Sequence, residues 1–123
     1  MYQIVLYETA GGESDVNEFL EDLRIKAVTN KDARIQYSQA VLYIQLLSLK
    51  GTSLPSKVVK HLVGDLWELR PGFNRVFFFY YKSGSEYVLL HHFRKKTEKT
   101  PKREIERAKA EMEDYILRKE KDI

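Results

Sequence analysis

Three apolar segments in a row, each divided from the next by a turn signal, constrain the fold of this chain more than any other feature. They are rich in aromatic and aliphatic residues and span residues 66–70, 74–81 and 86–93. A Pro-Gly pair at 71–72 and a Ser-Gly-Ser triplet at 83–85 divide them, and both are typical of hairpin turns. Strands joined by such short turns pair in opposite directions. The sequence therefore predicts an antiparallel three-stranded meander.

The beginning of the chain predicts a strand followed by a helix. Residues 2–8 are mostly β-branched, aliphatic or aromatic, and the glycine pair at 11–12 ends this strand. Ser14 or Asp15 is the expected N-cap of the first helix. Its apolar residues recur at helical spacing and are Val16, Phe19, Leu20 and Leu23.

A second helix is expected after a break at Asn30 and Lys31. Asp32 is its predicted N-cap and Gly51 its predicted C-cap. The apolar residues near one face of this helix are Ile35, Leu42, Leu46 and Leu49. Because the joint between the two helices is so short, we expect them to form an antiparallel hairpin that serves as a scaffold.

The end of the chain predicts a third helix. Residues 55–65 are expected to form a linker into the meander, and Thr100 is the expected N-cap of the last helix, with Pro101 in its first turn. The apolar stripe of this helix consists of Ile105, Ala108, Met112, Tyr115 and Ile116. The order β-α-α-β-β-β-α describes an α+β fold, a mainly antiparallel sheet with helices, and we expect one domain over residues 1–123.

Composition narrows the class of protein. Hydrophobic residues make up 43% of the chain, which is enough for a core. The chain has no cysteine, so it contains neither disulfides nor thiolate metal sites. The N-terminus lacks the pattern of a secretory signal, and no apolar run approaches the ~20 residues of a membrane helix. These features predict a soluble, cytoplasmic protein without membrane contact.

Positive charge is concentrated in one part of the chain. Residues 57–109 contain 13 lysines and arginines against 6 acidic residues, a net charge of +7, whereas residues 1–56 and 110–123 each have a net charge of −2. Scattered surface lysines solubilise many folds, but such clustering favours an anionic partner. A cationic cluster at the ends of sheet strands suits the phosphate backbone of a nucleic acid.

Several motifs in this basic part resemble those of a known toxin family. They are K-H-L-x-x-x-L-W-E-L-R, an arginine-headed aromatic strand, L-L-H-x-F-x-K-K-T-x-K-T-P and a helix with E-I-x-x-A. Over roughly residues 57–115 the chain resembles the phage-derived, HigB-like branch of the RelE/ParE toxins. The resemblance implies a RelE-like fold and a type II toxin that cuts mRNA on the translating ribosome. It also implies a HigA-like helix-turn-helix antitoxin, with DNA contacted only through the antitoxin complex.

RNA cleavage by the ribose 2′-OH requires a base, an acid and cations for the charge that grows on the phosphate. The sequence has no HxH or HExxH motif and no acidic cluster suited to two metals, so we expect neither a metal nor another cofactor. Lysine and arginine must then do most of this chemistry. Lys95 and Lys96 are candidates for the base or acid because neighbouring cations disfavour an ammonium group. Arg94 and Lys99 flank them and are candidate RNA-binding residues.

The resemblance aligns Arg75 with a strand arginine that contacts the scissile phosphate in this family. Arg75 is alternatively a structural ion-pair partner of Glu68 on the neighbouring strand. Arg70 shares a strand face with Glu68, so phosphate contact and structural pairing both remain open. The best-known RelE toxins have lysines in the strand occupied here by Leu66 and Glu68. Either Lys57 or Lys60 compensates for them, or the chemistry is slower and depends on the ribosome for positioning.

The adjacent His91 and His92 point to opposite faces of their strand and cannot bind one metal together. His92 is a candidate acid-base residue because it shares the strand face of Arg94, although a packed histidine is the commoner case. His61 lies in the expected linker and matters less.

Two other functions remain open. ParE-like relatives share the fold and inhibit DNA gyrase without cutting RNA, and a basic nucleic-acid-binding module would have no activity. An antitoxin would neutralise the +7 segment with an acidic surface or dock on the helical hairpin. The sequence does not decide between these two docking surfaces.

Overall fold

The computed structural model describes residues 1–122 and has an α+β fold, as predicted, that is compatible with the RelE-like fold. Its helices are α1 (Asp15–Lys26), α2 (Lys31–Lys50) and α3 (Lys102–Lys121). Its strands are β1 (Gln3–Leu6), β2 (Val59–Val63), β3 (Leu66–Leu69), β4 (Asn74–Tyr81) and β5 (Glu86–Arg94). None of the three helices is both long and apolar enough to cross a membrane.

The strands form one sheet in the order β1-β5-β4-β3-β2. The predicted meander is confirmed, because β3 pairs with β4 and β4 with β5 in antiparallel register. β1 pairs with β5 in parallel. The element order is β-α-α-β-β-β-β-α, one strand more than predicted.

The additional strand, β2, lies within the segment expected to be a linker, so that expectation is wrong. β2 pairs with β3 in antiparallel fashion, with Lys60 opposite Glu68 and His61 opposite Trp67. It is an edge strand with mostly exposed residues, and Gly64 with φ +55° allows the tight turn into β3. Its charged and polar residues suit an edge strand but conceal it in the sequence.

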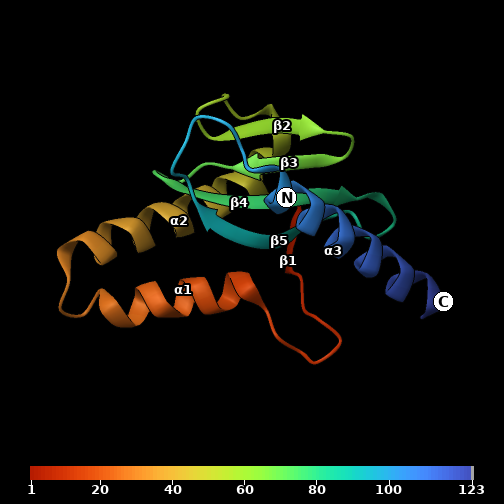
Figure 1. Cartoon of the computed structure of the whole chain (residues 1–123), viewed down its shortest axis with the longest axis horizontal. Coiled ribbons are helices and arrows are strands. Elements are labelled where there is room, and N and C mark those ends of the chain that lie inside the picture. The colour runs from red at the N-terminus through yellow and green to blue at the C-terminus, as the bar shows by residue number, and fades with distance from the viewer. Residues whose placement is uncertain (123) are drawn as a thin grey trace.

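Helices cover both faces of the sheet (Figure 1). The α1–α2 hairpin lies on one face and α3 on the other, and each face has its own apolar cluster. Phe78 belongs to the cluster under α1 and α2, whereas Phe77 and Phe79 belong to the cluster under α3. The aromatic run of β4 is therefore continuous because both of its faces are core.

The helix ends agree in part with the predicted caps. The Ser14 hydroxyl accepts a hydrogen bond from the Asn17 amide and caps α1, so Ser14, and not Asp15, is the cap among the two predicted residues. Gly51 follows α2 with φ +58°, also as predicted. The N-cap of α2 is Asn30 and not Asp32, because the Asn30 side chain accepts from the Ala33 amide.

Thr100 does not cap the last helix, which begins after Pro101 without a side-chain cap. The Thr100 hydroxyl instead donates a hydrogen bond to the Glu68 carboxylate, 3.1 Å away. A residue expected to stabilise the end of a helix thus belongs to a polar contact at the sheet.

The apolar face predicted for α2 is not the buried one. Ile35, Leu42 and Leu49 are each at least half exposed, whereas the buried residues are Ala33, Ala40 and Leu47. Residues 35–49 contain no charged residue, so polarity does not mark the solvent side of this helix. The two small alanines let the α2 backbone lie close to the rest of the core.

Candidate nucleic-acid interface

The sheet and the segment between β5 and α3 enclose a hollow of about 360 Å³. In Figure 1 this segment leaves the end of β5 and passes close to β2 and β3 before it enters α3. Five of the cations predicted as site residues line this hollow, and they are Lys60, Arg70, Arg75, Lys95 and Lys99. We call it the basic hollow.

Strand register explains why these cations meet. Lys60 lies opposite Glu68, and Arg75 lies opposite Phe93. Since side chains alternate between the faces of a sheet, Lys95 shares the face of Phe93 two residues before it. Side chains from three strands and one loop therefore converge on the α3 side of the sheet.

A single buried carboxylate lies among the arginines. Glu68 is 2% exposed, and its Oε2 lies 3.2 Å from Nε of Arg70 and 3.4 Å from Nε of Arg75. Arg75 Nη1 also donates to the carbonyl groups of Gly72 and Asn74, at 2.8 and 2.9 Å. Arg75 thus makes the structural ion pair that was one of its two predicted roles.

The basic hollow keeps an excess of positive charge despite this pairing. Its lining has five cations against two carboxylates, those of Glu68 and Glu98, which leaves a net of +3. Burial lowers the pKa of Arg75, and the nearby Arg70 adds to this effect while Glu68 opposes it. The guanidinium nevertheless stays charged at neutral pH. An anion that enters the hollow meets the buried guanidinium of Arg75 and the half-buried cations Arg70 and Lys95, while Lys60 and Lys99 are exposed.

A second hollow of about 310 Å³ adjoins the first, and Arg75 and Lys95 line both of them. Lys96 lines only the second, beside Phe73 of the β3–β4 turn. Lys95 is half-buried and Lys96 is exposed. The structure thus separates the two lysines that the sequence offered as alternatives.

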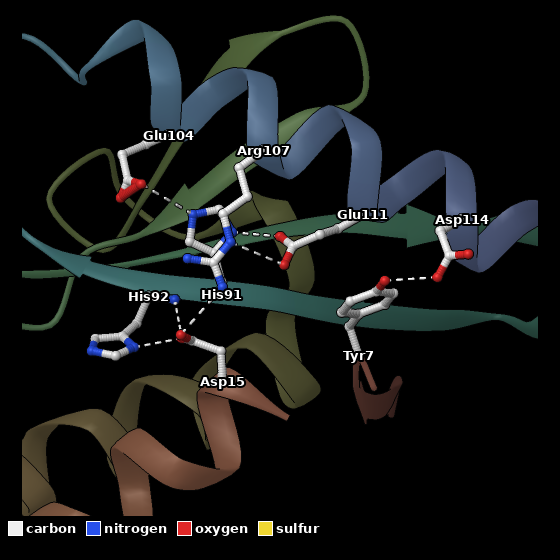
Figure 2. Close-up of polar contacts among 8 residues, drawn as sticks. All are labelled: Tyr7, Asp15, His91, His92, Glu104, Arg107, Glu111 and Asp114. Carbon is white, nitrogen blue, oxygen red and sulfur yellow. Dashed lines mark hydrogen bonds and ion pairs between the residues drawn. The ribbon is translucent and has the colours of Figure 1, made fainter. Parts of the chain in front are cut away.

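Three other predicted site residues lie outside the basic hollow. Arg94 donates to Gln36 of α2 at 3.2 Å, and its guanidinium lies 5.8 Å from the centre of the Phe73 ring. Lys57 is exposed and lines neither hollow. His92 lies on the opposite face of the sheet, against α1 (Figure 2).

His92 is a packed, hydrogen-bonded histidine. Its ring stacks on Phe19 at 4.1 Å, and its Nδ1 lies 2.6 Å from a carboxylate oxygen of Asp15. The His92 amide donates to the same oxygen at 2.8 Å. His91 points to the other face, as predicted for adjacent strand residues, and Nδ1 contacts Glu111 of α3 (Figure 2). Neither histidine reaches the basic hollow.

Arg107 of α3 completes this network in Figure 2. It lies 3.4 Å from Asp15 of α1 and 3.4 Å from Glu111 on its own helix. Through it the polar contacts tie α1, β5 and α3 together, so they stabilise the scaffold beneath the candidate site.

We expect Asp15→Asn to lower the free energy of unfolding by about 2 kcal/mol at pH 7. Burial raises the pKa of Asp15, but hydrogen bonds from His92 outweigh that and bring it to about 2, from an ordinary value of 3.8. A carboxyl with a lowered pKa stabilises the folded protein above pH 4, and this stabilisation disappears between about pH 4 and pH 2. Denaturant titrations at pH 7 and pH 2.5 measure the effect.

The control for this prediction is Asp22→Asn on the same helix, because Asp22 is exposed and pairs only with Lys26. We expect Asp22→Asn to change stability by no more than about 0.5 kcal/mol. If the free energy of unfolding falls between pH 7 and pH 2.5 as much in Asp15→Asn as in the wild-type protein, the assigned role of Asp15 is contradicted.

Sequence reasoning missed two features of the site. Glu68 was considered only as a partner of one arginine at a time, and Phe73 only as part of a turn. A glutamate between two arginines in strand register is a detectable signal for the first. An aromatic residue in a Pro-Gly turn, where turn geometry needs none, is a signal for the second.

His61 lines the hollow, but its ring packs edge-to-face on Trp67, its cross-strand partner.

Comparison with protein families decides the class of the chain. The model of the family described as Phage derived protein Gp49-like (DUF891) matches residues 22–113, which is most of the chain. The protein belongs to the Gp49-like family. This is a toxin-like family related to the RelE and HigB toxins, which confirms the resemblance at that level. No curated protein shows significant similarity to the chain.

Membership of the Gp49-like family implies the RelE-like endoribonuclease type of toxin and, in general, an antitoxin partner. The basic hollow lies within the matched residues, since its lining runs from Lys60 to Ile105. Within residues 1–122, no three histidine or acidic side chains are grouped as a metal site would require. The candidate site of this Gp49-like protein is thus built from cations around one buried carboxylate, that of Glu68.

Proposed function

We propose that this Gp49-like protein is the HigB-like toxin of a type II toxin–antitoxin pair and cuts mRNA on the translating ribosome. The observation that carries the proposal is the convergence of five cations on the basic hollow, with a net lining charge of +3. A phosphodiester is the anion that such a set of fixed cations suits best, because guanidinium groups match pairs of phosphate oxygens.

In the proposed reaction the ribose 2′-OH attacks its own 3′-phosphate. The 2′-oxygen forms a bond to phosphorus as a base takes up its proton, and the bond from phosphorus to the 5′-oxygen breaks as an acid gives that oxygen a proton. The products are a 2′,3′-cyclic phosphate and a 5′-hydroxyl end. No metal ion takes part in these steps.

Within this reaction Arg75 stabilises the charge that grows on the phosphate, because it is buried and oriented by three oxygen partners. Lys95 transfers one of these two protons, as the base for the 2′-OH or as the acid for the 5′-oxygen, since it lies at the border of both hollows. Arg70 is held by Glu68 and by the Ser56 carbonyl and adds positive charge to the same wall. These roles replace the one considered for His92, which lies on the other face of the sheet.

Lys60 and Lys99 are proposed to contact the RNA backbone at the mouth of the basic hollow, and Arg94 and Lys96 to extend the basic surface beyond it. The ribosome positions the mRNA, and a HigA-like antitoxin with a helix-turn-helix silences the toxin. Contact with DNA then occurs only through the complex with that antitoxin. The site of action is the cytoplasm, where translation takes place.

Expression of the protein in bacteria tests this function. We expect growth arrest with translation inhibited and transcripts shortened, while DNA stays intact. DNA damage with induction of the SOS response would instead support a gyrase-inhibiting toxin of the ParE type. Normal growth with the folded protein present would contradict both functions.

Lys57, just before β2, and Lys60, within it, differ in their expected contribution to RNA binding. Lys60 lines the basic hollow and Lys57 does not. For single-stranded RNA, the loss of one phosphate contact reduces the slope of log K against log salt by about 0.7. We therefore expect the salt dependence of binding to be weaker in Lys60→Ala, with a slope less negative by this amount. In Lys57→Ala the slope should be unchanged. Fluorescence anisotropy at several salt concentrations measures both, and equal slopes would refute the assignment of Lys60.

A further inference from the structure

Phe73 is a large aromatic residue that the fold does not bury. It is 67% exposed and lies in the turn between β3 and β4. In the strand that follows, Phe77 and Phe78 are fully buried. Packing in the core thus accounts for these two strand phenylalanines and not for Phe73.

The turn that carries Phe73 is held in place on both sides. The Lys95 amide donates to the Phe73 carbonyl at 2.7 Å, and the Asn74 amide donates to the Pro71 carbonyl at 3.1 Å. Gly72 has φ +63°, and a side chain there would come within 2.8 Å of the Gln39 amide oxygen. The ring is therefore displayed by an ordered turn, which limits the entropy lost when a ligand packs on it.

The surroundings of the ring have a net positive charge. The second hollow is lined, besides Phe73, by the cations Arg75, Lys95 and Lys96 and by one carboxylate, Glu98. The Arg94 guanidinium lies 5.8 Å from the ring centre. Arg75 and Lys95 separate this hollow from the basic hollow, since they line both. An apolar ring among cations suits a ligand that carries both flat apolar groups and negative charge. Single-stranded RNA has both, because its unpaired bases stack on aromatic side chains while its phosphates contact the cations.

We propose that Phe73 is a stacking platform for an unpaired nucleobase of the RNA strand whose phosphate occupies the basic hollow. This inference rests on the proposed function and deepens it, because it adds a base-binding position to a site that otherwise contacts only the backbone. The base lies in the second hollow, against the ring, with Lys96 and Arg94 at its edge. Stacking tolerates every base, so the platform positions the strand and favours the bases that stack best.

The test compares RNA with and without bases. One probe is a single-stranded oligonucleotide that cannot be cleaved because its riboses are 2′-O-methylated, and the other is the same backbone with abasic positions throughout. We expect Phe73→Ala to weaken binding of the base-containing probe by about five- to 150-fold and to leave binding of the abasic probe unchanged. Phe73→Trp should restore the affinity, and Phe73→Leu, which is apolar but not aromatic, should not.

The outcomes separate this inference from the function on which it rests. Equal loss for both probes would mean that Phe73 only supports the cations, and no loss for either would leave the ring without a role in RNA binding. Each result overturns the platform while the basic hollow stands. Failure of the wild-type protein to bind either probe at low salt would overturn the platform and the proposed RNA site together. Thermal melting is expected to be unchanged in Phe73→Ala, because the ring is mostly exposed.

Discussion

Lys95→Met is expected to lower the rate of mRNA cleavage by about 10²–10⁴-fold, the usual contribution of a group that transfers a proton in the transition state. Methionine keeps the length and apolar stem of lysine but can neither donate nor accept that proton. Lys95 is half-buried at the border of the two hollows, where substrate phosphate and ribose are proposed to lie. The measurement is single-turnover cleavage of mRNA on purified ribosomal complexes.

Lys96→Met is the matched control for this prediction. It removes the same charge from the adjacent residue, but Lys96 is exposed and lines only the second hollow. We expect a loss of less than about tenfold, as for one backbone contact near the surface. Similar losses in the two variants would mean that only local charge matters, and a larger loss in Lys96→Met would transfer the proton-transfer role to Lys96.

Arg75→Met is expected to reduce cleavage by at least about 10²–10³-fold, the effect of removing one preorganised donor to a developing negative charge. It should also lower the free energy of unfolding by about 1–3 kcal/mol, because Glu68 then loses one of its charged partners in a buried position. The loss stays below that of a fully broken buried ion pair since Arg70 and Thr100 still contact the carboxylate.

The double variant Arg75→Met, Glu68→Gln separates the two effects. Glutamine has the shape of glutamate without its charge, so no unpaired carboxylate remains and most of the lost stability should return. Cleavage should stay low, since the cation that stabilises the phosphate is still missing. If the double variant regains activity along with stability, Arg75 acts only as the structural ion-pair partner of Glu68 and does not contact the scissile phosphate.

Local sequence signals were enough to predict the central part of this fold. The meander followed from Pro71-Gly72 and the Ser-Gly-Ser turn, and the Ser14 cap from residue type alone. β2 was not predictable in the same way, because an exposed edge strand needs no apolar alternation. The buried face of α2 was missed since its middle has no charge to mark the solvent side.

The candidate site, too, could be predicted only in part from the sequence. The clustering of cations along the sequence indicated which segment to consider, but the position of each side chain depended on strand register. Lys60 and Arg75 converge with Lys95 only because β2 pairs with β3 and β4 with β5 as they do. His92 was assigned by its place in the sequence, whereas its partner Asp15 is 77 residues away. Such long-range pairs are set by packing, which one sequence does not display.

The chemical identity of the new RNA ends shows whether the cations of the basic hollow act on a ribose–phosphate linkage. Purified protein is incubated with programmed ribosomes, and the new ends are sequenced with and without enzymatic removal of cyclic phosphates. We expect 2′,3′-cyclic phosphate and 5′-hydroxyl ends that appear with the wild-type protein and vanish with Arg75→Met. Intact mRNA, or cuts that leave 5′-phosphate and 3′-hydroxyl ends, would contradict this expectation.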